Sequence, residues 1–218
     1  RCGRYRLVRR DPQVIWDTPK KEKGWKKMNA HYHRSAKGGG EWEFFDLPQE
    51  WTISYPLPIQ KTLNFHLKPF SFKHTGLFPE QAANWNWFSQ LIADAVSKGR
   101  QVKVLNLFAY TGGATLAAAA AGASVTHVDA SKGMVNWAKE NAAVSGLSDK
   151  PIRWLVDDCT KFAAADISAM RTKSLSGVMV TNPPYGERIG DRRGIEKIYE
   201  AYRRFFGENP TWSLFVVT

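Results

Sequence analysis

The tetrapeptide Asn182-Pro183-Pro184-Tyr185 directly follows the apolar run Gly177–Thr181 and combines a side-chain amide, two prolines and an aromatic ring. Both prolines fix φ and donate no N–H, so the turn is stiff and its carbonyl oxygens remain able to accept hydrogen bonds. Such a turn can hold a planar amino group between the Asn182 side-chain oxygen and the Pro183 carbonyl while the Tyr185 ring stacks on its face. The segment therefore predicts a site for methylating an exocyclic nitrogen. The alternative is an ordinary strand-to-loop turn.

A glycine-containing loop, Phe108–Ala114, follows an earlier apolar run. Its adjacent glycines, Gly112 and Gly113, allow a ligand to approach the backbone closely and can start a helix. The loop lacks the complete G-x-G-x-x-G pattern, so it provides poorly for the pyrophosphate of a dinucleotide. A Gly-Gly turn is also compatible with a purely structural role.

Acidic residues follow the next two apolar runs. Asp129 comes about 20 residues after the glycine loop, the spacing at which an acid binds ribose hydroxyls in nucleotide-binding folds. An acid here could instead cap a helix, but Ser131 can take the capping role and leave Asp129 to bind. Asp157 and Asp158 follow the third run, where a carboxylate could accept a hydrogen bond from an adenine amino group.

These four segments are expected at one edge of a single sheet. Strands are expected at residues 102–108, 124–129, 152–156, 177–181 and 212–218, and helices at 113–121, 132–145 and 195–206. This alternation predicts an α/β fold with a doubly wound, mostly parallel, Rossmann-like sheet. Ligands in such sheets bind beyond the carboxyl ends of the strands, near the point where the strand order reverses.

The N-terminal part of the chain has a different pattern. Short alternating segments at 41–45, 51–55, 63–67 and 69–72 predict a small antiparallel β region, and a helix is expected at 82–97. We therefore expect two domains: a basic, β-rich lead-in over residues 1–80 that contacts RNA, and the α/β domain over residues 81–218.

Charge supports the RNA expectation. The chain has 218 residues and a net charge of +11; residues 1–40 hold twelve Lys or Arg and three Asp or Glu, a net of +9, which leaves +2 for the rest. Aromatic residues interleave with this charge, at Tyr5, Trp16, Trp25 and Tyr32. A basic segment with aromatic side chains suits a polyanion with stackable bases. The alternative is a solvated basic face or a flexible arm.

Several other classes are disfavoured. No apolar run approaches the roughly 20 residues that span a bilayer. Cys2 and Cys159 are the only cysteines, so a disulfide framework is not expected and a reducing cytoplasm fits. No metal is expected, because His31 and His33 lie in a basic stretch without an acidic or Cys partner nearby in sequence.

Residues from about Arg4 to Phe162 resemble the bacterial large-subunit ribosomal-RNA methyltransferases related to the cytosine-C5 enzymes, within the Rossmann-fold methyltransferases that use S-adenosylmethionine (SAM). The resemblance is carried by His74–Gln81, Val104–Ala114, Val128–Gly133, Trp137–Asn141 and Val156–Asp158. It implies that SAM is the cofactor, that Asp129 binds its ribose and that Asp158 lies by its adenine. It implies that the methionine part is flanked by Gln81, Phe108, Tyr110, Thr111, Gly112 and Gly113.

Residues from about Ser174 to Thr218 are similar to a different group, the guanine-N2 ribosomal-RNA methyltransferases that carry a THUMP domain. The similarity rests on Thr181–Arg188 and Pro210–Ser213. In the motif after the fourth strand the first group usually has Asp-Pro-Pro, whereas this chain has Asn-Pro-Pro. The join falls near Ala163–Ser174. This resemblance implies that Asn182 borders both the cofactor and the target base. In these families the sheet continues past the fifth strand, so we expect this chain to stop before the last strands.

The expected function is SAM-dependent methylation of 23S ribosomal RNA at guanine N2, by direct transfer to the amino nitrogen and without a strong base. One alternative is a cytosine-C5 methyltransferase, which needs a cysteine nucleophile. Cys159 is a poor candidate because it is expected to pack as a small hydrophobic residue, and Cys2 lies in a terminal arm. A second alternative is an RNA-binding module without catalysis.

Overall fold

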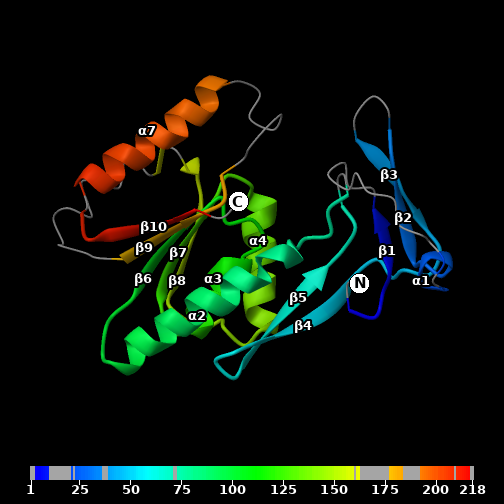
Figure 1. The fold of residues 1–218 in the computed structure, drawn as a ribbon, viewed down its shortest axis with the longest axis horizontal. Helices are drawn as coiled ribbons and strands as arrows, with labels where there is room; N and C mark the ends of the chain where they lie inside the picture. Colours follow the sequence, from blue (N-terminus) through cyan, green and yellow to red (C-terminus); the bar gives the residue numbers. More distant parts are fainter. Residues whose placement is uncertain are drawn as a thin grey trace. The chain divides into compact units, whose positions relative to one another are not determined.

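The structure, a computed structural model, divides into two compact units. It describes residues 3–9, 21, 23–35, 39–70, 73–159, 161–162, 177–183, 192–208 and 210–216. One unit comprises Arg1–Ser54 and Asn64–Leu77, and the other comprises Tyr55–Leu63 and Phe78–Thr218. The chain is coloured from blue to red along its length in Figure 1.

The second unit is built on a five-stranded parallel sheet, which confirms the expected α/β fold. Its strands lie in the order β10-β9-β6-β7-β8, and all neighbours in this order are parallel. The strands are β6 (Lys103–Leu107), β7 (Ser124–Asp129), β8 (Ile152–Val156), β9 (Gly177–Thr181) and β10 (Trp212–Val216). The order reverses at β6, which lies between β7 and β9. This is the topological switch point at which open α/β sheets bind ligands.

Helices cover both faces of this sheet (Figure 1). One layer contains α2 (Ala82–Ser97), α3 (Gly113–Ala120) and α4 (Lys132–Val144), and α7 (Arg192–Glu208) covers the opposite face. The core under α7 joins Leu105, Leu107 and Met179 of the sheet to Tyr202 and Phe205 of the helix. Burying such side chains stabilises the layer by roughly 1.5–3 kcal/mol each.

The first unit contains a three-stranded sheet and most of a hairpin. Strands β1 (Leu7–Arg9), β2 (Ala30–Arg34) and β3 (Gly40–Phe44) pair in that order; β1 and β2 run parallel, and β2 and β3 antiparallel. The short helix α1 (Lys23–Lys26) precedes β2. The hairpin of β4 (Trp51–Leu57) and β5 (Lys61–Leu67) contributes its tip to the second unit, where the Tyr55 hydroxyl donates to Asn86 Oδ1 of α2 at 3.1 Å.

One expectation for this region was wrong, and two strands of this region were not expected. No strand forms at 69–70, where Phe70 N donates to His74 O; residues 71 and 72 lie outside the described residues. Strands β1 and β2 were not anticipated. Gly40 explains how β2 and β3 approach so closely: a Cβ added there would lie 2.1 Å from the His33 carbonyl oxygen, so only glycine fits.

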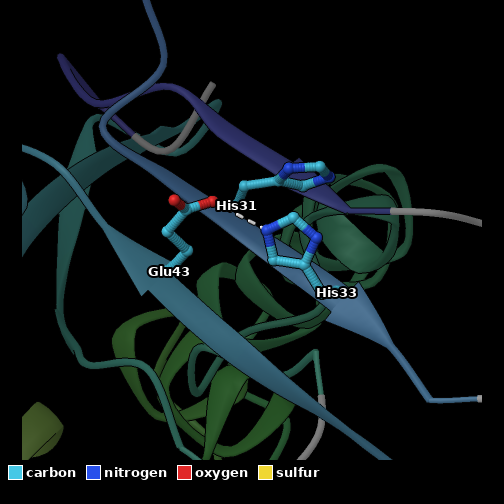
Figure 2. A group of neighbouring side chains, drawn as sticks. All are labelled: His31, His33 and Glu43. Atoms are coloured by element: carbon cyan, nitrogen blue, oxygen red, sulfur yellow. Dashed lines mark hydrogen bonds and ion pairs between the residues drawn. The ribbon is translucent and has the colours of Figure 1, made fainter.

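The expectation that His31 and His33 lack an acidic neighbour was also wrong. Antiparallel pairing places Glu43 of β3 directly opposite His31, and His33 Nε2 lies 2.8 Å from Glu43 Oε2. Figure 2 shows the three side chains together. The sequence alone does not indicate this contact, because ten residues separate His33 from Glu43.

None of the helices in the described part of the chain is both long and apolar enough to cross a membrane.

Candidate active site

Strand register places the loops after β6, β7, β8 and β9 along one edge of the sheet. Leu107 pairs with Val128 on one side and with Thr181 on the other, and Asp129 pairs with Val156. The residues that follow these positions therefore lie in line at the carboxyl edge. Because parallel strands all end on this side, the fold gathers segments that are up to about seventy residues apart in sequence.

Asp129 anchors the glycine loop. Its Oδ2 accepts from the Tyr110 backbone N–H at 2.8 Å, and its Oδ1 accepts from the Ser131 N–H at 2.9 Å. Ser131 caps α4 by accepting from the Met134 N–H at 3.4 Å, as the sequence predicts. The Asp129 carboxylate is thus held in a fixed orientation at the carboxyl edge, next to the central strand β6.

The loop after β6 adopts an unusual backbone. Phe108 and Tyr110 have φ values of 53° and 52°, in the left-handed region that non-glycine residues rarely occupy. Such conformations persist only where surrounding contacts enforce them, and they cluster at functional sites. The contacts here are the Asp129 bond, a buried bond of 2.9 Å from Asn141 Nδ2 to the Thr111 carbonyl, and the Tyr110 ring 5.1 Å from that of Phe78. Asn141 is a supporting residue whose role was not predicted.

Close packing explains why both of these loop positions are glycine. Gly112 has φ of 90°, and a Cβ there would lie 3.0 Å from Ala138 and Leu116. At Gly113 a Cβ would lie 2.5 Å from the Trp85 ring of α2. The start of α3 therefore packs directly on the aromatic ring, and a larger residue would displace the loop.

Gln81 lies at the end of the turn Pro79–Gln81, at the N-cap of α2. Its side-chain oxygen accepts from Asn84 Nδ2 at 2.8 Å. Gln81 is half-buried and follows Phe78, whose ring contacts Tyr110 of the glycine loop. Its chain segment therefore reaches the same loop as Asp129.

Asn182 and Pro183 follow β9 and are half-buried. The end of β9 is fixed by a hydrogen bond between Thr181 Oγ1 and the Tyr202 hydroxyl of α7, both buried. Burial raises the pKa of Tyr202 to about 12, so its hydroxyl stays neutral. Pro184 and Tyr185, together with Glu187 and Arg188, lie outside the described residues.

The residues after β8 divide into two exposed acids and one buried thiol. Asp157 N donates to the Asp129 carbonyl at 3.1 Å, and Asp157 Oδ1 accepts from the Asp158 N–H at 2.7 Å. Cys159 Sγ accepts from the Phe108 N–H at 3.1 Å, and the residue is 2 % exposed. Burial raises the Cys159 pKa to about 12, so this thiol is not a nucleophile at neutral pH. The prediction that Cys159 packs in the core is confirmed.

A buried polar chain beneath the edge was not predicted. Asn106 Nδ2 donates to Thr115 Oγ1 at 2.9 Å, and Thr115 Oγ1 lies 2.9 Å from His127 Nδ1. These residues belong to β6, α3 and β7 and are at most 4 % exposed. Their hydrogen bonds connect β6 and α3, which flank the glycine loop, to the neighbouring strand β7. The sequence feature that could have indicated this network is Asn106, a polar residue among the apolar residues of β6.

We expect His127 to make folding pH-dependent. Burial, with a smaller effect of the Lys139 charge, lowers its pKa from 6.5 to about 3. Below pH 6.5 the His127 ring is protonated in the unfolded chain but stays neutral in the folded chain. The free energy of unfolding therefore decreases as the pH falls toward 3. The loss should approach about 1.4 kcal/mol per pH unit.

Urea unfolding between pH 7 and pH 4.5 tests this expectation. In His127→Gln the free energy of unfolding should depend less steeply on pH, because the amide can bond to Thr115 but does not titrate. His66→Gln, at a half-buried position in β5, serves as the control. Parallel curves for wild type and His127→Gln would contradict the assignment.

A doubly wound parallel sheet with a glycine loop, an acid after the second strand and Asn-Pro-Pro after the fourth defines the class of Rossmann-like, SAM-dependent methyltransferases. Residues 94–217 match the family model described as UPF0020, RMKL-like, methyltransferase domain. This is more than half of the chain, and the chain belongs to this family. The single match spans both sides of the join expected near Ala163–Ser174.

Relatives and solved structures agree with this class. A ribosomal RNA large subunit methyltransferase K/L from Shewanella frigidimarina is 40% identical over 99 residues, 45% of this chain and 13% of that protein. A SAM-dependent methyltransferase from Agrobacterium tumefaciens superposes with a TM-score of 0.71 and 39% identity, over 84% of this chain and 55% of that one. The SMU.776 structure, complexed with SAH, gives 0.62 at 20% identity, over 88% and 48%. This chain thus spans only part of each of these proteins.

Proposed function

We propose that this chain forms the methyl-transferring part of an enzyme that uses SAM to methylate ribosomal RNA at an exocyclic base amine, guanine N2. The observation that carries the proposal is the position of Asn182 beside the glycine loop at the switch point of the sheet, two strands from Asp129. The similarity to a ribosomal RNA large subunit methyltransferase supports the substrate class. Such a substrate would place the reaction in the cytoplasm.

The residues at the edge suit an adenosine-type cofactor. A carboxylate offers about four acceptor positions, and backbone N–H groups occupy one on each oxygen of Asp129. The carboxylate can therefore also accept from two ribose hydroxyls without losing its anchoring bonds. Asp158 would lie by the adenine. Gln81 and the loop residues Phe108, Tyr110, Thr111, Gly112 and Gly113 would flank the methionine part, and Asn182 would border it.

The chain would promote methyl transfer mainly by positioning the target amine against the methyl group. SAM supplies an electrophilic methyl group on a sulfonium. The amine of guanine is a weak nucleophile because its lone pair is delocalised into the ring. Hydrogen bonds from this amine to the Asn182 side-chain oxygen and the Pro183 carbonyl would favour a pyramidal nitrogen, with Pro184 stiffening the turn and Tyr185 stacking on the base. Alignment of the two reacting atoms can supply roughly 7–11 kcal/mol.

The basic N-terminal unit would contact the RNA. Its described part includes the exposed residues Lys26 and Arg34, together with Trp25, which is 41% exposed. The Trp42 and Phe44 rings stack 6.4 Å apart at 21°, and Phe44 is 55% exposed. Exposed rings among cations suit unpaired bases and their phosphates. A base within structured RNA must leave its stack to reach the site.

Product identification tests the proposal. The chain is incubated with labelled SAM and unmodified ribosomal RNA, and the modified nucleoside is identified by mass spectrometry. We expect N2-methylguanosine. Formation of 5-methylcytidine would overturn the choice of atom, and SAM binding without any methylated nucleoside would favour a non-catalytic RNA-binding module.

A further inference from the structure

The central strand β2 and the edge strand β3 of the N-terminal sheet carry a group of side chains that the proposed function does not use. His31 and His33 lie two residues apart on β2 and so face the same side of the sheet. Glu43 of β3 pairs with His31 and therefore lies on that side too. The two imidazole rings are 4.0 Å apart between centroids, and Glu43 Oε2 lies 2.8 Å from His33 Nε2. Figure 2 shows the three side chains directed toward one another.

We propose that His31, His33 and Glu43 form a binding site for a divalent transition metal ion of the zinc type. One ligand atom from each residue lies within 4.8 Å of the other two. Imidazole nitrogens and carboxylate oxygens bind Zn²⁺ at about 2.0–2.2 Å, which separates neighbouring ligands in a tetrahedral site by roughly 3.4 Å. The His33–Glu43 pair must open by about half an ångström, and His31 must move closer by at most about 1.4 Å.

Both adjustments involve side chains rather than backbone. The His33 and Glu43 side chains are 53% and 52% exposed, so rotation about their χ angles meets little packing. The backbone underneath is held by the β2–β3 ladder, whose register runs without interruption from Ala30–Phe44 to Arg34–Gly40. The sheet thus supplies the spacing, and the ion would replace the single contact between His33 and Glu43 with bonds to all three side chains.

The charge on this side of the sheet favours a cation. Glu41 pairs with His33, so two carboxylates share the side with the two histidines, in a region of the chain that is otherwise strongly basic. Two carboxylates would repel the phosphates of RNA, so this side of the sheet suits a metal ion better than RNA. His33 and Glu41 also line an open depression of about 420 Å³, which leaves His33 accessible to an ion from solvent.

Three protein ligands leave a fourth position to water, the arrangement of an accessible rather than a closed metal site. The ion would bridge β2 to β3 and stabilise their pairing. Imidazole ligands suit Zn²⁺, Ni²⁺ and Cu²⁺ better than Mg²⁺ or Ca²⁺, which prefer all-oxygen sites. The site is therefore expected to discriminate between these two groups of ions.

Calorimetric titration of Zn²⁺ into the whole 218-residue chain, freed of any affinity tag and of chelator, tests the proposal. We expect saturable binding of one ion per chain and no comparable signal with Mg²⁺. Loss of a second-shell partner already weakens metal binding about ten- to a hundredfold. His31→Ala, His33→Ala and Glu43→Gln should each weaken it by at least tenfold.

Two control variants separate coordination from charge. Glu41→Gln removes the same charge from the same side of β3 but lies outside the three-residue group, and His66→Ala removes a histidine of the β4–β5 hairpin; neither should change the affinity more than about threefold. Zn²⁺ should also raise the thermal midpoint of the wild type and not that of His33→Ala, because only a folded site gains from the ligand. Absence of saturable Zn²⁺ binding, or equal affinity in wild type and all three site variants, would overturn the proposal.

Discussion

Replacing Asp129 with alanine should weaken SAM binding about ten- to a hundredfold and leave RNA affinity almost unchanged. The carboxylate would accept the ribose hydroxyls, and charge-assisted hydrogen bonds of this kind contribute about 1.5–3 kcal/mol. The substitution also removes the acceptors of Tyr110 N and Ser131 N, so the glycine loop loses its central anchor. Calorimetry with SAM, and separately with RNA, measures both affinities.

Two further variants distinguish ribose binding from loop anchoring. Asp149→Ala removes an exposed acid before β8, at the amino end of the strand, and should not affect SAM affinity. Asn141→Ala removes the buried bond to the Thr111 carbonyl but no expected cofactor contact. It should lower the thermal midpoint with a smaller loss of SAM affinity than Asp129→Ala. If Asn141→Ala weakened SAM binding as much as Asp129→Ala, Asp129 would be acting through the loop and not on the ribose.

Much of the α/β unit could be predicted because its strands are rich in apolar residues and its central strands are largely buried. The strands Ile152–Val156 and Gly177–Thr181 have the bounds expected from sequence. Right-handed crossovers then fix which strand ends share an edge. For this reason Phe108, Asp129 and Asn182 could be brought to one edge without any knowledge of contacts.

Other features depend on partners that sequence does not reveal. In the segment Ala30–Arg34, Ala30 and Tyr32 alternate with His31 and His33. Pairing with β1 and β3 makes this segment a strand, and the pairing with β3 brings Glu43 to the histidines. Asn106 and His127 are polar residues at the centre of apolar strands. Thr115 of α3 bonds to both, and the local sequence does not indicate this partner. Local pattern indicates a face of a strand, whereas pairing and packing decide what covers it.

Replacing Asn182 with alanine should produce the opposite effect to Asp129→Ala: SAM binding is retained and methyl transfer falls. The amide oxygen is expected to meet the target amine and to strengthen its bond as the nitrogen becomes pyramidal, so its loss should reduce kcat about ten- to a hundredfold. Asn182 is half-buried after a strand end held by Thr181 and Tyr202, so the variant should keep its fold. Single-turnover transfer at saturating SAM measures the chemical step.

The conservative variant Asn182→Asp separates an acceptor role from a purely structural one. Aspartate keeps an oxygen at this position and has nearly the same shape, so methyl transfer should remain much closer to wild type than in Asn182→Ala. A requirement for the amide nitrogen would make both variants equally slow. If Asn182→Ala abolished SAM binding but spared turnover at saturating SAM, Asn182 would belong to the cofactor site alone. The acceptor for the target amine would then have to be the Pro183 carbonyl, whose position no side-chain substitution at residue 182 removes.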